Sequence, residues 1–254
     1  MKSYIAFTTK EFTEQLRTHK ALIMFTVFLL FGIMNPVTAK LTPIILEMFM
    51  PEGVEITLGD PTALDSWAQF FKNIPQMGIF VLAIVFNGLM ANEFTKGTLI
   101  NILTKGLSRS TVILSKFSMA ILLWTASYIL CFAVSYGYTI YFWSNDIVYN
   151  LLFAVFVLWL FGVLIISLLL FGGVLFKNSY GSLLLTGTTV VIMFLINIVP
   201  ILQKYNPVLL SSSNMDLLTG KMQPSDFTAS IIVTTALTMT FIVVAIPIFN
   251  KKRI

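Results

Sequence analysis

Charge is scarce in this sequence, and none of it falls in the long apolar stretches. Charged residues make up 11% of the 254 residues, whereas soluble domains carry about 25%. The lack of charge at depth also removes the ionisable groups on which secondary carriers generally depend. Six stretches contain no Asp, Glu, Lys or Arg: residues 21–39, 74–92, 117–142, 147–176, 182–203 and 227–249.

Cysteine and histidine are almost missing as well. Cys131 is the only cysteine and His19 the only histidine, which excludes an internal disulfide and the usual metal-ligand spacings. The sequence contains neither an H-E-x-x-H nor a G-x-x-x-x-G-K-[ST] motif. We therefore expect no catalytic site, no metal and no cofactor on this chain, which is not an enzyme by itself.

What the sequence has in abundance is apolar length. Hydrophobic residues make up 57% of the chain, and the mean hydropathy is +0.90. A bilayer core of about 30 Å needs roughly 20 apolar residues as a helix, whereas barrel strands are about 10 residues long and alternate. The six stretches therefore predict a single all-α integral membrane domain over residues 1–254. The fourth stretch is long and holds Gly162, Gly172 and Gly173, so we expect it to tilt or break.

The first stretch has a rival interpretation as a signal peptide. The residues at 37–39 loosely resemble a cleavage site. However, the 20 residues before the stretch are longer than a typical basic leader and carry both Glu11 and Glu14. We therefore favour a membrane helix.

Basic residues are divided unequally between the two sides of the membrane. With six spans, 12 basic residues lie on the side that carries both termini, and four lie on the other side. The positive-inside rule therefore places both termini in the cytoplasm of a multi-pass plasma-membrane protein. The isoelectric point of 9.3 follows from this sorting and gives no reason to expect nucleic acid as a partner.

The segment before the first span is amphipathic. If residues 3–20 are helical, Ile5, Phe12 and Leu16 lie on one stripe, and charged residues lie opposite. This spacing is typical of a helix lying on the bilayer surface. A docking face for a cytosolic protein and a merely solvated leader are the alternatives.

The loop at residues 93–116 is the most structured cytoplasmic segment by sequence. Lys96 follows Glu93 by three positions, which is the spacing of a helical ion pair. Leu99 and Leu103 would share an apolar face of a short helix. Such a face needs a cover, which is either another protein or the lipid and the N-terminal helix of the same chain.

This loop resembles the first cytoplasmic loop of ABC-2 type transporter permeases. One departure is Gly106-Leu107, where such permeases often carry a proline. The amphipathic N-terminal helix, the six spans and the basic C-terminus fit the same family in layout. The residues that carry the resemblance are Glu93, Lys96, Gly97, Thr98, Leu99, Leu103, Ser108, Arg109 and Lys116.

The resemblance implies a type V (ABC-2/ABCG-like) exporter fold in which the loop helix is a coupling helix. The coupling residues it implies are Glu93, Lys96, Gly97, Thr98, Leu99 and Leu103. It would dock on a separate ATP-binding subunit, and that subunit would bind the ATP and Mg²⁺. Two ATP-binding subunits and a second permease copy, identical or different, would complete the complex.

Polar residues at depth are sparse, and four of them are candidates for a translocation path. Asn87 lies in the second stretch, and Thr186, Thr189 and Asn197 lie in the fifth. Hydrogen bonding between helices is the alternative role for all four. In similar permeases these two spans line the central path.

The outer loops carry two further predictions. Residues 62–73 read as a short helix with Trp67, Phe70 and Phe71 on its membrane side. In the resembled fold, the region at 204–226 dips back as short re-entrant helices.

A mostly apolar path suits a hydrophobic or amphipathic cargo better than a bare ion. The resemblance to small permeases of Gram-positive bacteria, including those of phenol-soluble modulin exporters, implies export of a peptide, toxin or antimicrobial. Export of lipid, antibiotic or sodium is an alternative within the same class. An ATP-independent transporter or a membrane scaffold is the alternative outside it.

Overall fold

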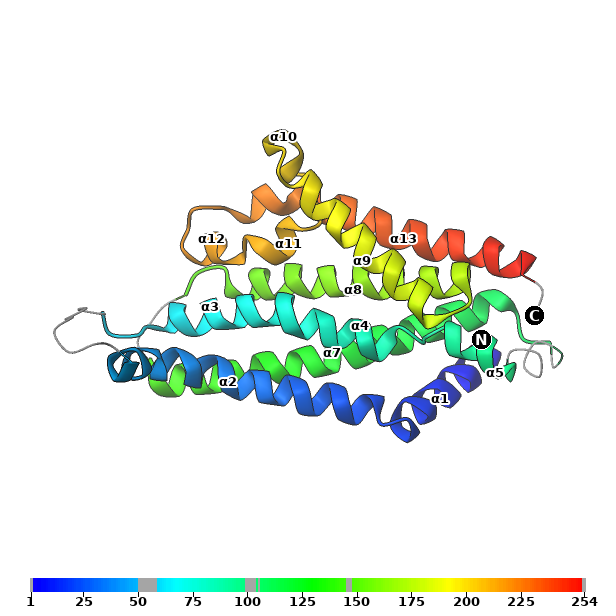
Figure 1. Cartoon of the computed structure of the whole chain (residues 1–254), viewed down its shortest axis with the longest axis horizontal. Coiled ribbons are helices and arrows are strands. Elements are labelled where there is room, and N and C mark those ends of the chain that lie inside the picture. Colours follow the sequence, from blue (N-terminus) through cyan, green and yellow to red (C-terminus); the bar gives the residue numbers. More distant parts are fainter. Residues whose placement is uncertain (1, 50–58, 99–103, 105, 145–147, 253–254) are drawn as a thin grey trace.

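The structure is a computed structural model that describes residues 2–49, 59–98, 104, 106–144 and 148–252. Within these residues the chain is helical and has no strand. Six helical segments in the described part are long and apolar enough to cross a membrane. Figure 1 shows the long helices lying side by side, with both chain ends at the same end of the bundle. The prediction of an all-α protein with six helices long and apolar enough to cross a membrane is therefore confirmed.

The N-terminal segment folds as α1 (Lys2–Arg17), and α2 (Lys20–Phe49) follows it directly. His19 has a φ of 58°, and this left-handed residue separates the two helices. The first span was predicted to end at residue 39, but α2 continues for ten further residues. The charge of Lys40 does not end the helix, because its ammonium lies 4.0 Å from the centre of the Phe142 ring.

The second span is built from four consecutive pieces. Its first piece begins at Thr62, which forms a capping box with Asp65. The short helix predicted at residues 62–73 is therefore present as the start of this span. The pieces are α3 (Ala63–Asn73), the π-helix η1 (Ile74–Gly78), α4 (Ile79–Phe86) and α5 (Ala91–Lys96).

The prediction that the aromatic residues of this short helix face the membrane is wrong. Trp67, Phe70 and Phe71 are buried. The ring of Phe132 lies 5.7 Å from that of Trp67 and 6.5 Å from that of Phe70. Because α3 continues into the bundle, its apolar face packs on α7 rather than on lipid.

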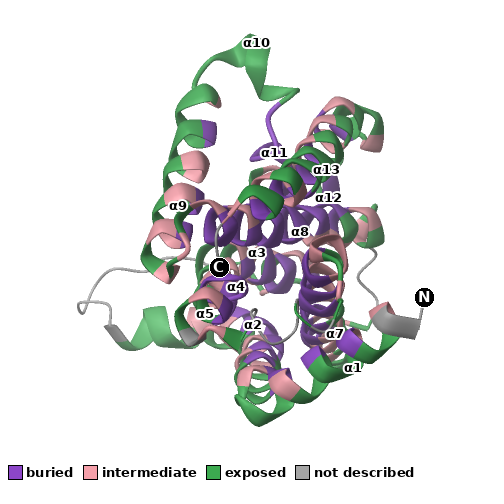
Figure 2. Ribbon diagram, turned by 90° about the vertical axis from the view of Figure 1, so that its right-hand side faces the viewer, coloured by how far each residue is buried: buried purple, intermediate pink, exposed green. Residues whose placement is uncertain are grey.

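The third and fourth spans form the centre of the bundle. The third, α7 (Arg109–Phe142), begins eight residues earlier than predicted, because Ser108 caps it by accepting a hydrogen bond from the Thr111 amide at 3.2 Å. The fourth, α8 (Leu151–Phe176), is one unbroken helix, so of the tilt or break expected at its glycines the break does not occur. Most of its residues are buried (Figure 2), and its exposed side chains, Leu152, Phe156 and Phe176, lie toward its ends.

The glycines of α8 serve close packing instead. A methyl group at Gly162 would lie 2.5 Å from the Trp124 indole, and one at Gly172 would lie 2.9 Å from the backbone of Ser182. A methyl group at Gly173 would lie 3.1 Å from the side chain of Met90. These positions let α7, α9 and the turn before α5 approach α8 closely.

The last third of the chain contains the fifth and sixth spans. The fifth, α9 (Ser179–Ile196), is shorter than predicted and is followed by the separate helix α10 (Pro200–Gln203). Two short helices, α11 (Leu209–Ser212) and α12 (Asn214–Leu218), pack against α8 with buried leucines, as expected of a segment that dips back. The chain ends with the 3₁₀ turn η2 (Pro224–Phe227) and α13 (Thr228–Lys251).

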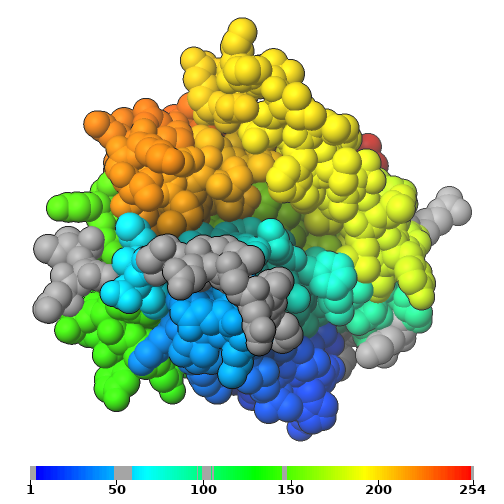
Figure 3. Space-filling view, turned by 60° about the vertical axis from the view of Figure 1, so that its left-hand side comes forward, coloured from blue at the N-terminus to red at the C-terminus, as the bar shows by residue number. Residues whose placement is uncertain are grey.

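The outer surface of the bundle is apolar. Figure 3 shows α9 and α10 standing out from the rest of the molecule. Many of their large apolar side chains are exposed, as are others on α2 and α13. Soluble proteins seldom expose apolar patches of this extent, whereas a bilayer covers them without cost. The side chains include Leu22, Leu30, Leu184, Phe194, Ile201, Ile232 and Val243.

Substitution of Gly162 tests the close approach of α7 and α8. Trp124 is fully buried and its indole N–H donates to the Trp159 carbonyl oxygen at 3.1 Å, so the ring cannot move aside. We expect Gly162→Ala to lower the free energy of unfolding by about 1–3 kcal/mol through overpacking. Thermal unfolding of the purified protein in detergent measures the change.

Gly187→Ala is the matched control, because a methyl group there meets nothing within 4 Å. This variant should be as stable as the wild type or slightly more stable, since alanine favours a helix. Equal melting temperatures for the two variants would contradict the packing described for α8.

Candidate functional site

A buried cluster of charged side chains joins three helices at the end of the bundle where both termini lie. The Lys116 ammonium of α7 lies 2.8 Å from Glu11 Oε2 of α1 and 2.8 Å from Glu93 Oε1 of α5. The three residues are only 2%, 1% and 4% exposed. Because a buried charge without a partner is very costly, this triad fixes α1 and α5 against α7.

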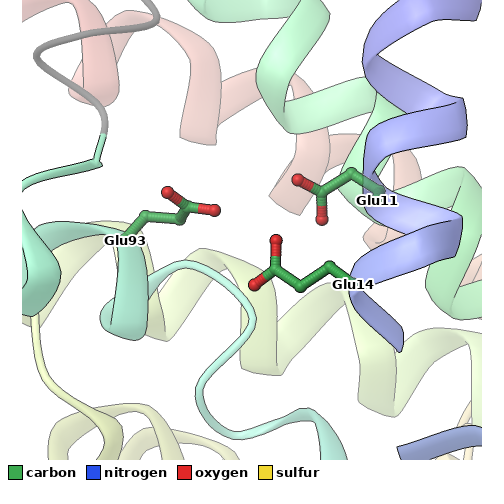
Figure 4. A group of neighbouring side chains, drawn as sticks. All are labelled: Glu11, Glu14 and Glu93. Atoms are coloured by element: carbon green, nitrogen blue, oxygen red, sulfur yellow. The ribbon is translucent and has the colours of Figure 1, made fainter. Parts of the chain in front are cut away.

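Lys10 and Glu14 extend the triad toward solvent. The Lys10 ammonium lies 2.7 Å from Glu14 Oε2, 3.1 Å from Glu11 Oε1 and 3.3 Å from Glu93 Oε1. Burial would lower the pKa of Lys10, but its hydrogen bond to Glu14 and the charges of Glu11 and Glu93 raise that pKa above its usual range. Figure 4 shows Glu11 and Glu14 pointing from one helix toward Glu93 on the opposite side.

The amphipathic pattern of α1 explains why the cluster forms. Glu11, Gln15 and Thr18 follow one another at helical spacing on the face that lines the cluster. One turn earlier, Tyr4 and Thr8 of the same helix donate hydrogen bonds to Ser118 at 2.8 Å and to Ser115 at 3.2 Å. The packed face of α1 is therefore largely polar, although it also carries the buried Phe7.

The predicted interfacial stripe of α1 lies on its outward side. Ile5, Phe12 and Leu16 are all exposed. Their exposure is the arrangement that a helix on the bilayer surface requires, because its apolar side chains must reach the lipid. The role of the stripe as a membrane contact stays a prediction.

A cavity of about 440 Å³ opens beside the cluster. The side-chain oxygen Oε1 of Gln15, a residue only 5% exposed, has no hydrogen-bond partner in the described part of the chain. Carboxylate oxygens of Glu11, Glu14 and Glu93 lie within 4.8 Å of one another, which is close enough to surround one cation. In this structure the Lys10 ammonium already bonds to all three.

The structure places three of the predicted coupling residues. Glu93 faces inward and pairs with Lys116 and Lys10. Thr98 donates a hydrogen bond to Glu93 Oε2. Gly97 ends α5 with a φ of 63°, a conformation that favours glycine.

The other predicted coupling residues are not placed in the same detail. Lys96 is the last residue of α5, and its side chain is outside the part that the structure describes. Leu99 and Leu103 also lie outside the described residues. The predicted apolar docking face therefore stays a prediction.

Arg109, part of the motif that carries the family resemblance, holds the C-terminal end of α13. Its guanidinium donates to the Phe249 carbonyl oxygen and, at 2.9 Å, to the Lys252 carbonyl oxygen. Lys252 in turn donates to the Leu175 carbonyl oxygen of α8 at 2.8 Å. These bonds satisfy carbonyls that helix ends leave open, so they anchor α13 to α7 and α8.

The four candidate path residues do not form one site. Thr186 and Thr189 donate to the carbonyl oxygens of their own helix, at Ser182 and Leu185. Asn197 is the C-cap of α9 and accepts at its backbone oxygen from Gln203. No hydrogen bond in the described part of the chain connects Asn87 with these three residues. The structure therefore favours local hydrogen bonding for the two threonines, and their role in a path remains a prediction.

Glu11 and Gln15 were not predicted to have a functional role, and Lys116 was predicted only as part of the motif that resembles ABC-2 permeases. The sequence does contain a pattern that predicts a buried Lys116. The lysine lies at helical spacing among apolar residues, and these residues are buried in the structure. A lysine in the middle of an apolar helical face must have a buried partner. The four apolar neighbours are Val112, Ile113, Met119 and Ala120.

Comparison of the chain with models of protein families, with curated proteins and with solved structures finds no significant match.

Removing the Lys116 ammonium tests the role of the cluster in stability. Lys116→Met leaves Glu11 and Glu93 buried without their main partner, so we expect a loss of about 3–5 kcal/mol in the free energy of unfolding. Lys10→Met is the matched control, because half-exposed pairs contribute only about 0–1 kcal/mol. Denaturant titration in detergent compares the two, and equal losses would show that Lys116 is not the centre of the cluster.

Proposed function

We propose that this chain is the membrane subunit of an ATP-driven exporter and that a separate ATP-binding subunit acts on it through the loop between α5 and α7. One observation carries the proposal: the Glu93–Lys116 ion pair joins the two helices that enter and leave this loop. Glu11 connects the same pair to α1. A protein that pushed the loop would therefore move three helices as one unit.

The local structure on both sides of the loop supports this mechanism. The chain leaves α5 at Gly97, in a left-handed conformation, and re-enters a helix at the capping residue Ser108. Both chain ends lie at this end of the bundle (Figure 1). The excess of basic residues on this side favours the cytoplasm, which is where a soluble ATP-binding subunit would meet the loop.

Buried charge gives some support to an ion-coupled carrier that works without ATP. The helices are longer than predicted, so charged residues, among them Lys40, Lys72, Glu93 and Lys116, fall inside the segments Lys20–Met48, Ala63–Thr95 and Arg109–Phe142. The expectation that the spans hold no charge is corrected to that extent. However, Lys116 lies seven residues after the start of α7, about 10 Å along the helix, and so near the membrane boundary. A position at the boundary favours the structural role, and we place the ATP-driven exporter first.

The cargo we propose is hydrophobic or amphipathic, such as a peptide, a toxin or an antimicrobial. The support is the apolar character of the spans, which offer few groups to replace the hydration of an ion. A second permease copy, identical or different, would complete the path. Export of a lipid or an antibiotic would use the same surfaces.

Leu103→Asp tests the proposed docking of the loop. The chain would be purified from its own cells with the ATP-binding subunit that accompanies it. A buried apolar anchor lost at an interface costs about 2 kcal/mol or more, so we expect binding of that subunit to weaken by about 30-fold or more. Stimulated ATP hydrolysis would fall with it.

Leu103→Met, which preserves the apolar side chain, is the matched control and should keep binding and hydrolysis. Unchanged binding and hydrolysis in the aspartate variant would count against docking through this loop. Cargo transport by the reconstituted chain alone, without ATP, would support the carrier instead.

A further inference from the structure

Two cavities adjoin at the cytoplasmic end of the proposed exporter. The charged cavity of about 440 Å³ and a second cavity of about 410 Å³ share Lys20 and Asn92 in their linings. Both volumes lie within the range of small-molecule sites, about 300–1,000 Å³. The second cavity is a groove between α2 and α4 and is mainly apolar. Apart from the shared residues and Asn87, it is lined by Ile23, Val27, Val81, Ile84 and Val85.

Gln15 gives the charged cavity an unused acceptor. Its side-chain oxygen is buried and has no donor among the described residues. Native proteins rarely leave a buried polar atom unbonded, and such an atom can mark the place of a missing ligand. The missing group must supply an N–H, an O–H or a positive charge.

The ammonium of Lys10 shows what kind of group the cavity accepts. An ammonium has three donors, and Lys10 directs them at Glu11, Glu14 and Glu93 and none at Gln15. The Lys10 side chain is 42% exposed, so it can withdraw into solvent without leaving a sealed core. If a ligand ammonium replaces that of Lys10, three positive charges, with those of Lys116 and Lys20, still face the three carboxylates.

The groove gives the ligand a direction. From Lys20 and Asn92, the lining runs along α2 to Val27 and along α4 to Val81, away from the end that carries the termini. A polar head at the cluster would thus place an attached chain along the helices and into the bilayer region. This polarity matches an amphipathic molecule in the cytoplasmic leaflet.

We propose that these two cavities form one binding site for an amphipathic primary amine, whose ammonium displaces that of Lys10 and bonds to Gln15 while its apolar chain fills the groove. The interpretation of this amine as cargo rests on the proposed export function. The binding itself requires no ATP-binding subunit. It can therefore fail or succeed independently of the coupling mechanism.

The test measures binding of dodecylamine to the purified chain by native mass spectrometry. Dodecylamine is protonated at pH 7, as lysine is. Dodecyltrimethylammonium has the same charge and chain but no N–H donor. A hydrogen bond to a charged group changes affinity by roughly tenfold, so we expect dodecylamine to bind the wild type about tenfold more tightly.

Two variants should change dodecylamine affinity in opposite directions. Gln15→Leu removes the free acceptor, so the preference for dodecylamine should disappear while the melting temperature stays the same or rises. Lys10→Met removes the internal competitor, so dodecylamine should bind several-fold more tightly. Thr13→Val, on the exposed side of α1 and outside both cavities, is the control and should change neither value.

Three results would overturn the proposal. Equal affinity for the two amphiphiles in the wild type would show that no hydrogen-bonding head site exists. An unchanged preference in Gln15→Leu would remove the acceptor from the site. Competition by phosphatidylethanolamine, a lipid with a primary amine, at the concentration of ordinary membranes would make the site a resident-lipid site and not a cargo site.

Failure of ATP coupling with normal dodecylamine binding would instead refute only the proposed function.

Discussion

A lysine ammonium enclosed by apolar helices must find partners inside the protein, and much of this structure follows from that constraint. Lys116 is almost completely buried on a face of α7 that is otherwise apolar. It is neutralised from two directions, by Glu11 of α1 and by Glu93 of α5. Because removing either partner would leave an uncompensated charge, the position of both helices is coupled to that of α7.

The same constraint explains the orientation of α1. The helix presents its polar face to α7, where Tyr4, Thr8 and Glu11 make their hydrogen bonds. Its apolar stripe must then point outward, where the bilayer surface is the natural cover. An element that looks like a simple surface anchor is thus also one wall of a charged cavity. Through this arrangement α1 connects the outward apolar stripe to the helices on both sides of the loop, as the proposed coupling requires.

Apolar length predicted the number of membrane helices correctly, but not where they end. Charged residues were taken as boundaries, yet Lys40 and Lys116 lie inside helices because a ring or two carboxylates accommodate their charge. The true start of α7 is set by the capping residue Ser108. An amphipathic pattern also does not say what covers its apolar face, which is why Trp67 was assigned to the membrane and is found in the core.

The site was only partly predictable for a related reason. The family resemblance named Glu93, Gly97 and Thr98 as a local motif, and all three do have defined roles at the end of α5. Glu11, which shares the Lys116 ammonium with Glu93, is 82 positions from Glu93 in the sequence, and no local periodicity can bring such distant residues together. The unbonded oxygen of Gln15 is a property of three-dimensional packing alone.

Amide hydrogen exchange of α1 in lipid nanodiscs tests most directly whether the Lys116 cluster holds these elements together. If it does, the amides of residues 6–17, which are hydrogen-bonded within α1, exchange slowly in the wild type and much faster in Lys116→Met, while the amides of α8 remain protected in both. Equal protection of α1 in the two proteins would contradict the account, because α1 would then be held by something other than the buried ammonium.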